Sequence, residues 1–111
     1  MSFSLSQLHD ATLIAVRFDW VGRTCLLEFA GAPDFVEPFA LMFFEVSEVL
    51  IPARAPWGPS VSVLEGRSNN SGRYEFSMQS GDTIAILSHS APAFQSAAMQ
   101  SLADIQPVSS A

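Results

Sequence analysis

The chain has 111 residues, a net charge of −6, and 49% hydrophobic against only 14% charged residues. This composition excludes a disordered chain and allows one domain with a single core. The five basic residues are scattered arginines, so nucleic acids and anionic membranes are poor partners, whereas a protein with a basic surface fits the charge. The small charged fraction also favours a homo-oligomer or a bound partner. One cysteine, no signal-peptide pattern and no membrane-length apolar run predict a cytoplasmic protein.

The first strand is predicted over residues 12–20, after a polar lead-in (residues 1–10) that is typical of one short helical turn or an edge strand. Apolar and polar side chains alternate along it, which indicates a strand with one buried side. The predicted buried face carries Ile14, Val16, Phe18 and Trp20. A second strand, residues 23–30, would pair with it as a hairpin and bury Cys25, Leu27 and Phe29.

The loop of this first hairpin determines which residues pair. A two-residue loop of Val21 and Gly22 would force a β-branched valine to positive φ. A four-residue loop, residues 19–22, requires only Gly22 to be left-handed and pairs Val16 with Cys25. We therefore predict the longer loop.

Both faces of residues 39–46 are apolar, which predicts a strand covered on both sides, either inside a sandwich or against another subunit. Helix is the competing interpretation because Ala, Leu, Met and Glu favour helices, but the phenylalanines favour a strand. Residues 51–60 are rich in proline and predict a rigid loop. A further strand is expected from Val61 to about Arg67.

The clearest hairpin is predicted over residues 72–89, where apolar and polar side chains alternate in both arms. A three-residue loop, residues 79–81, places Phe76 opposite Ile84, so that the apolar faces match. Such a loop ends in a left-handed residue, and Gly81 stands at that position. Turn chemistry and apolar pattern therefore agree on one register.

After this hairpin the pattern changes, and the helical spacing of residues 93–105 predicts a short C-terminal helix or a loose tail over residues 91–111. Residues 8–90 would form the core of a single domain, residues 1–111. Short strands with turn signals between them predict an all-β fold, which is an antiparallel sandwich or a partly closed barrel of about six to seven strands.

His9 and Asp10 are the most prominent polar pair. Neighbouring side chains on an extended chain point to opposite faces, so we expect no catalytic dyad between them, and Asp10 is expected to accept backbone amides before the first strand. His9, His89 and a carboxylate have no diagnostic metal-site spacing. Cys25 is predicted to be a core residue. No phosphate loop, nucleophile elbow or zinc pattern is present, so no catalytic residue, metal or cofactor is predicted.

Both tryptophans are candidates for a recognition surface. Trp57 stands between prolines on the predicted rigid loop, where it would lose little entropy on binding, although it could instead cap an open end of the sandwich. Trp20 belongs to the loop of the first hairpin and is expected to be partly exposed. With His9 and Asp10, these two residues are the candidate binding residues. Tyr74 could line a pocket, but packing on the sheet is its simpler role.

Three stretches stand out together: LHDA (residues 8–11), PWGPSVSV (residues 56–63) and MQSGDTI (residues 78–84). They span roughly residues 8–90 and resemble families of small uncharacterised all-β bacterial proteins, some of which are similar to immunity proteins that neutralise a toxin. The resemblance implies a bacterial β-domain that stands alone, and it assigns no catalytic residue.

The sequence therefore favours a non-enzymatic bacterial protein-binding domain, of the immunity type, with an acidic face for a basic partner. A second hypothesis is a small-molecule binding or catalytic barrel with Trp57, His9 and His89 at its mouth, and their convergence on one deep cavity would support it. A third is a structural homodimer that buries the face of residues 39–46.

Overall fold

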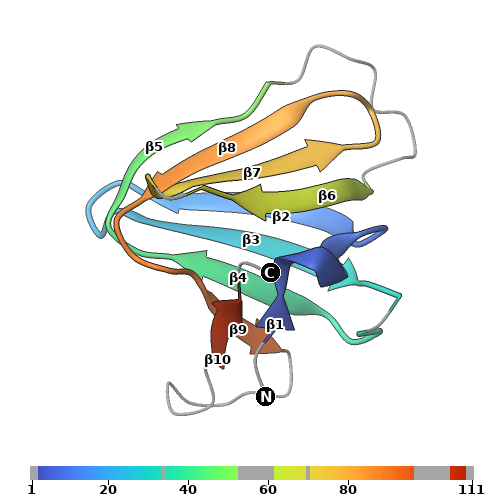
Figure 1. Cartoon of the computed structure of the whole chain (residues 1–111). Coiled ribbons are helices and arrows are strands. Elements are labelled where there is room, and N and C mark those ends of the chain that lie inside the picture. Colours follow the sequence, from blue (N-terminus) through green and yellow to red (C-terminus); the bar gives the residue numbers. More distant parts are fainter. Residues whose placement is uncertain (1–2, 34, 53–61, 70, 97–105, 110–111) are drawn as a thin grey trace.

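Two β-sheets packed face to face form this protein (Figure 1). The structure, a computed structural model, describes residues 3–33, 35–52, 62–69, 71–96 and 106–109. Among these residues, one 3-10 turn, η1 (Leu5–Leu8), is the single helical element. The sheets do not close into a barrel. The predicted all-β sandwich is therefore confirmed, with more strands than the six or seven expected.

The larger sheet has six strands in the order β1-β10-β9-β4-β3-β2. Neighbouring strands are antiparallel except β1 and β10, which run parallel. The strands are β1 (Phe3–Ser4), β2 (Thr12–Asp19), β3 (Thr24–Gly31), β4 (Phe39–Phe43), β9 (Ala93–Ser96) and β10 (Gln106–Ser109). Segments that are far apart in the sequence thus lie side by side in one sheet (Figure 1).

The smaller sheet has four antiparallel strands in the order β5-β8-β7-β6. The strands are β5 (Val46–Leu50), β6 (Val63–Ser68), β7 (Arg73–Met78) and β8 (Thr83–Ser88). Strands β6 to β8 follow one another as a meander and β5 lies beside β8, which is the arrangement of a Greek key. The two sheets also join at one edge, where Thr12 bridges to Ser62 and the amide of Val63 donates to the carbonyl of Ala11 over 2.8 Å.

The core lies between the sheets and is rich in aromatic rings. Phe29 and Phe39 of the larger sheet stack with centroids 4.9 Å apart, and Phe43 meets Phe76 of the smaller sheet edge to face at 6.0 Å. Full burial of one such side chain contributes about 1.5–3 kcal/mol to stability. The largest fully buried side chains are Phe29, Phe43, Phe76, Leu5, Leu8, Leu27, Leu41, Met78, Ile84, Ile86, Val63 and Cys25.

The β7–β8 hairpin has the predicted register. Phe76 pairs with Ile84, and the amide of Met78 donates to the carbonyl of Asp82 over 2.8 Å, which closes a three-residue loop. Gly81 has φ of 104°, so it takes the left-handed position that was expected of it. Turn glycine and apolar alternation were sufficient to determine this pairing.

The loop of the β2–β3 hairpin differs from the predicted one. Phe18 pairs with Cys25, and the loop consists of residues 20–23. The carboxylate of Asp19 accepts hydrogen bonds from two loop amides, each over 3.1 Å. The left-handed residue is Arg23, with φ of 55°, rather than the loop glycine. The predicted register is wrong because the aspartate side chain stabilises a turn that does not need a left-handed glycine.

The predicted buried face of β2 is wrong at Ile14 and at Phe18, which is 38% exposed and packs against Trp20 near the hairpin tip. Leu13 pairs with Phe29 and Ala15 with Glu28, which leaves Ile14 as the extra residue of a β-bulge. The alternation therefore changes face at this point: Leu13 is buried, whereas the side chain of Ile14 is 61% exposed. A regular pattern of alternating residues carries no sign of such an insertion.

Residues 39–46 form parts of two strands in different sheets instead of the single strand that was expected. The chain turns at Glu45, which has φ of 51°, and β5 then begins in the smaller sheet. One face of β4 lies in the core. The other face carries Ala40 and Met42, which are only half-buried, so the described part of the chain covers one side of β4 and not both.

Residues 93–96 and 106–109 are strands, which contradicts the predicted C-terminal helix or loose tail. Phe94 pairs with Leu41 of β4 and is buried, while the half-buried Gln95 pairs with Ala40. This alternation of two residues is that of a strand, and it is set by the core of the sandwich. The remainder of the expected helix lies outside the described residues.

Candidate functional site

The outer face of the smaller sheet carries a network of ion pairs. Arg67 lies 2.9 Å from Glu65 and 3.0 Å from Glu75, and Arg73 lies 2.8 Å from Glu75. The hydrogen bond from Arg73, followed by the charges of both arginines, holds the pKa of Glu75 below its usual value. Exposed ion pairs of this kind contribute little stability, and they leave these four charged groups of β6 and β7 paired with one another.

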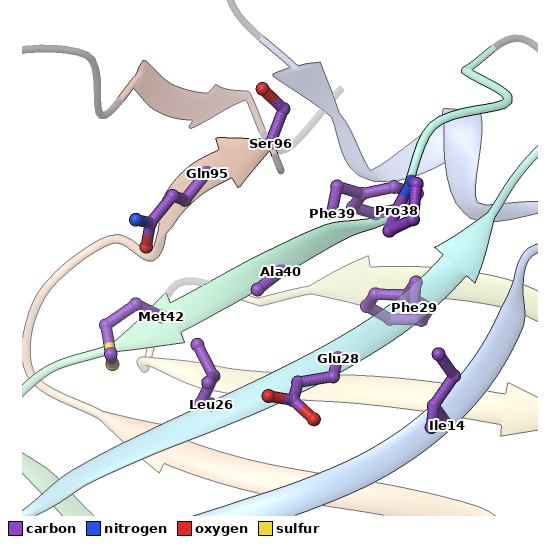
Figure 2. A pocket seen from close by; sticks show the side chains of 10 residues that line it. All are labelled: Ile14, Leu26, Glu28, Phe29, Pro38, Phe39, Ala40, Met42, Gln95 and Ser96. Atoms are coloured by element: carbon purple, nitrogen blue, oxygen red, sulfur yellow. The ribbon is translucent and has the colours of Figure 1, made fainter. Parts of the chain in front are cut away.

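The outer face of the larger sheet is different, because it contains an apolar hollow of about 330 Å³ (Figure 2). We call this the docking hollow. Its wall includes Ile14 of β2, Leu26 of β3 and Met42 of β4. Figure 2 shows Ala40 at the centre of the hollow, between Glu28 of β3 and Gln95 of β9.

The docking hollow results from a small residue surrounded by longer ones. Ala40 stands directly opposite Glu28 on one side and Gln95 on the other, so its single methyl group leaves space above the sheet. Leu26 and Met42 form the adjacent cross-strand pair. The β-bulge adds Ile14, which it turns away from the core to the outer face. The small side chain of Ala40, the pairing of β4 with β3 and β9, and the bulge in β2 together therefore produce the concave apolar surface.

Of the described residues that line the docking hollow, Glu28 is the one with a charge. Its carboxylate lies 3.0 Å from Nε of Arg17, and its side chain is 30% exposed against 68% for the arginine. The hydrogen bond and the charge of Glu28 raise the pKa of Arg17. An exposed pair of this kind contributes little stability, so a partner can replace one member of the pair at low cost.

Trp20 is exposed, as predicted, but it does not line the docking hollow. Its side chain is 71% exposed at the tip of the β2–β3 hairpin, beside Val21. Its ring meets that of Phe18 edge to face at 5.8 Å, and the guanidinium of Arg23 lies 5.2 Å from its centroid. These contacts hold the indole ring in place on an accessible loop.

His9 and Asp10 contact each other, which contradicts the expectation that they point to opposite faces. Their Nε2 and Oδ2 atoms are 3.5 Å apart because Asp10 has φ of 66° and is not extended. His9 Nδ1 donates to the carbonyl of Leu64 over 2.7 Å, and Asp10 Oδ1 accepts from the side-chain amide of Gln79 over 2.7 Å. Among the described residues, Asp10 thus accepts a side-chain amide and not the backbone amides predicted. The pair links the end of η1 to β6 and to the β7–β8 turn.

The structure does not bring His9 and His89 together. His9 contacts the start of β6, whereas His89 follows β8, and its amide lies 3.3 Å from the carbonyl of Glu45. The two residues therefore lie at opposite ends of the strands of the smaller sheet. Trp57, the third residue of the hypothetical barrel mouth, lies outside the described residues. Within the described part of the chain, no group of three or more metal-binding side chains occurs, and no helix has the length and hydropathy of a membrane span.

Cys25 is a core residue, as predicted. Its side chain is fully buried on the inner face of β3, and burial raises the pKa of the thiol to about 11. The thiol therefore stays protonated near neutral pH, and the thiolate that a nucleophile or metal ligand requires does not form.

The docking hollow was not predicted from the sequence. The one sign of the docking hollow in the sequence was the second apolar face of residues 39–46, which includes Ala40 and Met42. The contributions of Leu26 and Ile14 could be found only with the register of three strands and the position of the bulge. The predicted candidates His9, Asp10 and Trp20 all lie elsewhere on the surface.

The chain matches no family model, no curated protein and no solved structure. Function must therefore be inferred from the two outer faces, the net charge and the polar groups of the described residues.

Proposed function

We propose that this chain is a non-enzymatic bacterial domain that binds another protein, and that the partner docks on the docking hollow. The observation that carries the proposal is the contrast between the two outer faces. Ion pairs lie across β6 and β7 of the smaller sheet, which also exposes Leu50 and Leu64. The larger sheet presents Leu26, Met42 and Ile14 around a concave surface. An exposed apolar patch of this kind is typical of a protein interface, and one anchor side chain buried there would supply much of the binding energy.

The charge of the chain favours a partner with a basic surface. The net charge is −6, and the docking hollow has Glu28 as its charged lining residue. A partner that presents an apolar anchor beside a lysine or arginine would fill the hollow and replace Arg17 as the cation next to Glu28. Complementary charge also raises the association rate, and this effect falls as salt increases.

An immunity-type role gives the proposal a concrete form. The stretches LHDA and MQSGDTI resemble small bacterial proteins of which some are similar to toxin-neutralising proteins. A toxin with a basic surface is a partner of the required chemistry. In this role the domain needs no catalytic group, because occupying the toxin's surface is sufficient.

The test uses calorimetric titration with the protein encoded by the gene next to that of this chain. We expect direct binding that Ala40→Arg weakens by at least about 100-fold, because a long cation then fills the hollow. Met42→Lys is a second variant at the rim. Ser47→Arg is the matched control, since it adds the same charge at an exposed position of the smaller sheet and should change the affinity less than about threefold.

Circular dichroism would confirm that each variant is folded. No binding by the wild-type chain would contradict the immunity-type role, and binding that both hollow variants leave unchanged would exclude this face. Light scattering provides a separate test of the homodimer. If the wild-type chain is a dimer that Ala40→Arg dissociates, a second copy covers the hollow, and the proposed partner is wrong.

A further inference from the structure

A second hollow lies at the end of the smaller sheet where β7 begins and β8 ends. Its volume is about 350 Å³, and it shares no lining residue with the docking hollow. Asn69, Ser71 and Gly72 form one wall, and the residues following β8 form the other. We call it the polar hollow, because side chains with hydroxyl, amide and imidazole groups dominate its lining.

The frame of the polar hollow is held by its own hydrogen bonds. The amide of Ser88 donates to the carbonyl of Gly72 over 2.9 Å, which fastens the two walls together. Asn69 Oδ1 accepts from the amide and hydroxyl of Ser71, over 3.0 and 2.8 Å, and from the amide of Arg73 over 3.2 Å. These groups are already paired, so the walls are ordered before any ligand enters.

Two lining groups have no such partner. Within the described part of the chain, neither the hydroxyl of Tyr74 nor the imidazole of His89 makes a hydrogen bond, and both residues line the polar hollow. The ring of Tyr74 is fixed edge to face against Phe43 at 5.2 Å, so its hydroxyl has a defined position. A phenol and a neutral imidazole can each donate and accept one hydrogen bond.

The remaining lining indicates which ligand these groups would bind. Among the residues that the structure describes, no Asp, Glu, Lys or Arg lines the polar hollow, so a charged ligand would find no counter-ion in this lining. The hydroxyls of Ser88 and Ser90 already donate to the carbonyl of Phe44, so they add acceptors, and the side-chain amide nitrogen of Asn69 adds donors. The ring of Tyr74 adds an apolar surface. A ligand whose hydroxyl groups both donate and accept, on a ring with apolar C–H groups, complements this set.

We propose that the polar hollow binds a neutral hydroxylated ligand, either a free monosaccharide or the terminal sugar of a glycan, through Tyr74 and His89. The volume lies at the lower end for small-molecule sites and fits one sugar ring. The site is independent of the docking hollow, so either proposal can fail while the other stands.

The test is a titration of the whole 15N-labelled chain with sugars, monitored through the amide signals of its NMR spectrum. The probes are methyl β-D-glucoside, methyl β-D-galactoside and methyl α-D-mannoside as monosaccharides, lactose and cellobiose as models of a glycan end, and glucose 6-phosphate as a charged control. We expect saturable shifts in residues 69–74 and 88–91 with at least one neutral probe. Tighter binding of a disaccharide would identify a glycan end as the ligand, and equal or weaker binding would identify a free sugar.

Variants assign the shifts to the proposed groups. Tyr74→Phe removes only the hydroxyl and should weaken binding by about three- to tenfold, as should His89→Ala on its exposed segment. His9→Ala is the matched control, because it removes an exposed histidine far from the polar hollow. The amide spectra also show whether each variant is folded. The proposal is wrong if no neutral probe saturates, if glucose 6-phosphate binds more tightly than the neutral sugars, or if the shifts persist unchanged in a variant that lacks both groups.

Discussion

Two turn glycines of the smaller sheet are required for different physical reasons. Gly81 and Gly72 both have positive φ, 104° and 83°. A Cβ added at Gly81 would meet nothing within 4 Å, whereas one at Gly72 would lie 2.5 Å from the carbonyl oxygen of Ser88. Backbone conformation alone explains the first glycine. Conformation and a close backbone contact together explain the second.

This difference predicts unequal costs of substitution. We expect Gly81→Ala to lower the free energy of unfolding by about 1 kcal/mol, which is the strain of a left-handed alanine. Gly72→Ala should cost about 2 kcal/mol or more, because the backbone of Ser88 must also move. Urea unfolding of both variants would measure the two losses, and equal losses would contradict the contact at Gly72.

Among the elements, the two hairpins show which parts of the fold the sequence could predict. The β7–β8 register was predictable because Gly81 and the apolar alternation require the same pairing. The β2–β3 register was not, because the side chain of Asp19 binds two loop amides and Arg23 takes the left-handed position. The bulge at Ile14 leaves no local sign either. The register of a hairpin could be predicted where its turn depends on a glycine. It could not be predicted where side-chain contacts stabilise a turn that needs no left-handed glycine.

The bulge in β2 predicts an inverted pattern of sensitivity at two neighbouring positions. Leu13→Ala should lower the free energy of unfolding by about 2 kcal/mol, because Leu13 is buried against the core. Ile14→Ala should change it by less than about 0.5 kcal/mol, because its side chain is 61% exposed. Urea unfolding measures both effects. A larger loss of unfolding free energy for Ile14→Ala than for Leu13→Ala would contradict the bulge and support the regular alternation that the sequence indicates.

For the whole molecule, the sandwich could be predicted and the candidate sites could not. Alternating strands are a local signal, and they sufficed for the fold class. The docking hollow depends on Ala40 standing between residues of β3 and β9, and the polar hollow depends on two turns meeting at one end of a sheet. Both hollows result from contacts between segments that are far apart in the sequence, and a single sequence does not show which segments meet.

The burial of Cys25 between the sheets makes the stability of the whole molecule depend on pH in alkaline solution. The pKa of the thiol is raised to about 11 in the folded chain, against about 8.5 when it is exposed. The unfolded chain therefore loses this proton first, so the free energy of unfolding should fall as pH rises from about 8.5 to about 11. Urea unfolding over this range measures the slope, and Cys25→Ala should remove this contribution.

A thiol reagent gives an independent check at pH 8. We expect Cys25 to react only as fast as the sheets separate, and at the full rate of a free thiol once urea unfolds the chain. Immediate reaction of the folded protein, or the same alkaline slope in the alanine variant, would contradict the buried position of Cys25.

The bulge at Ile14 also affects how the chain behaves among many copies of itself. Strand β2 lies at the edge of the larger sheet, where free backbone groups are a template for another strand. The extra residue breaks the even spacing of those groups, and the charged side chains of Arg17 and Asp19 stand farther along the same strand. A regular β-strand from another molecule cannot continue its ladder past this irregularity. The same insertion that turns Ile14 toward the docking hollow therefore protects the sheet from aggregation through its edge.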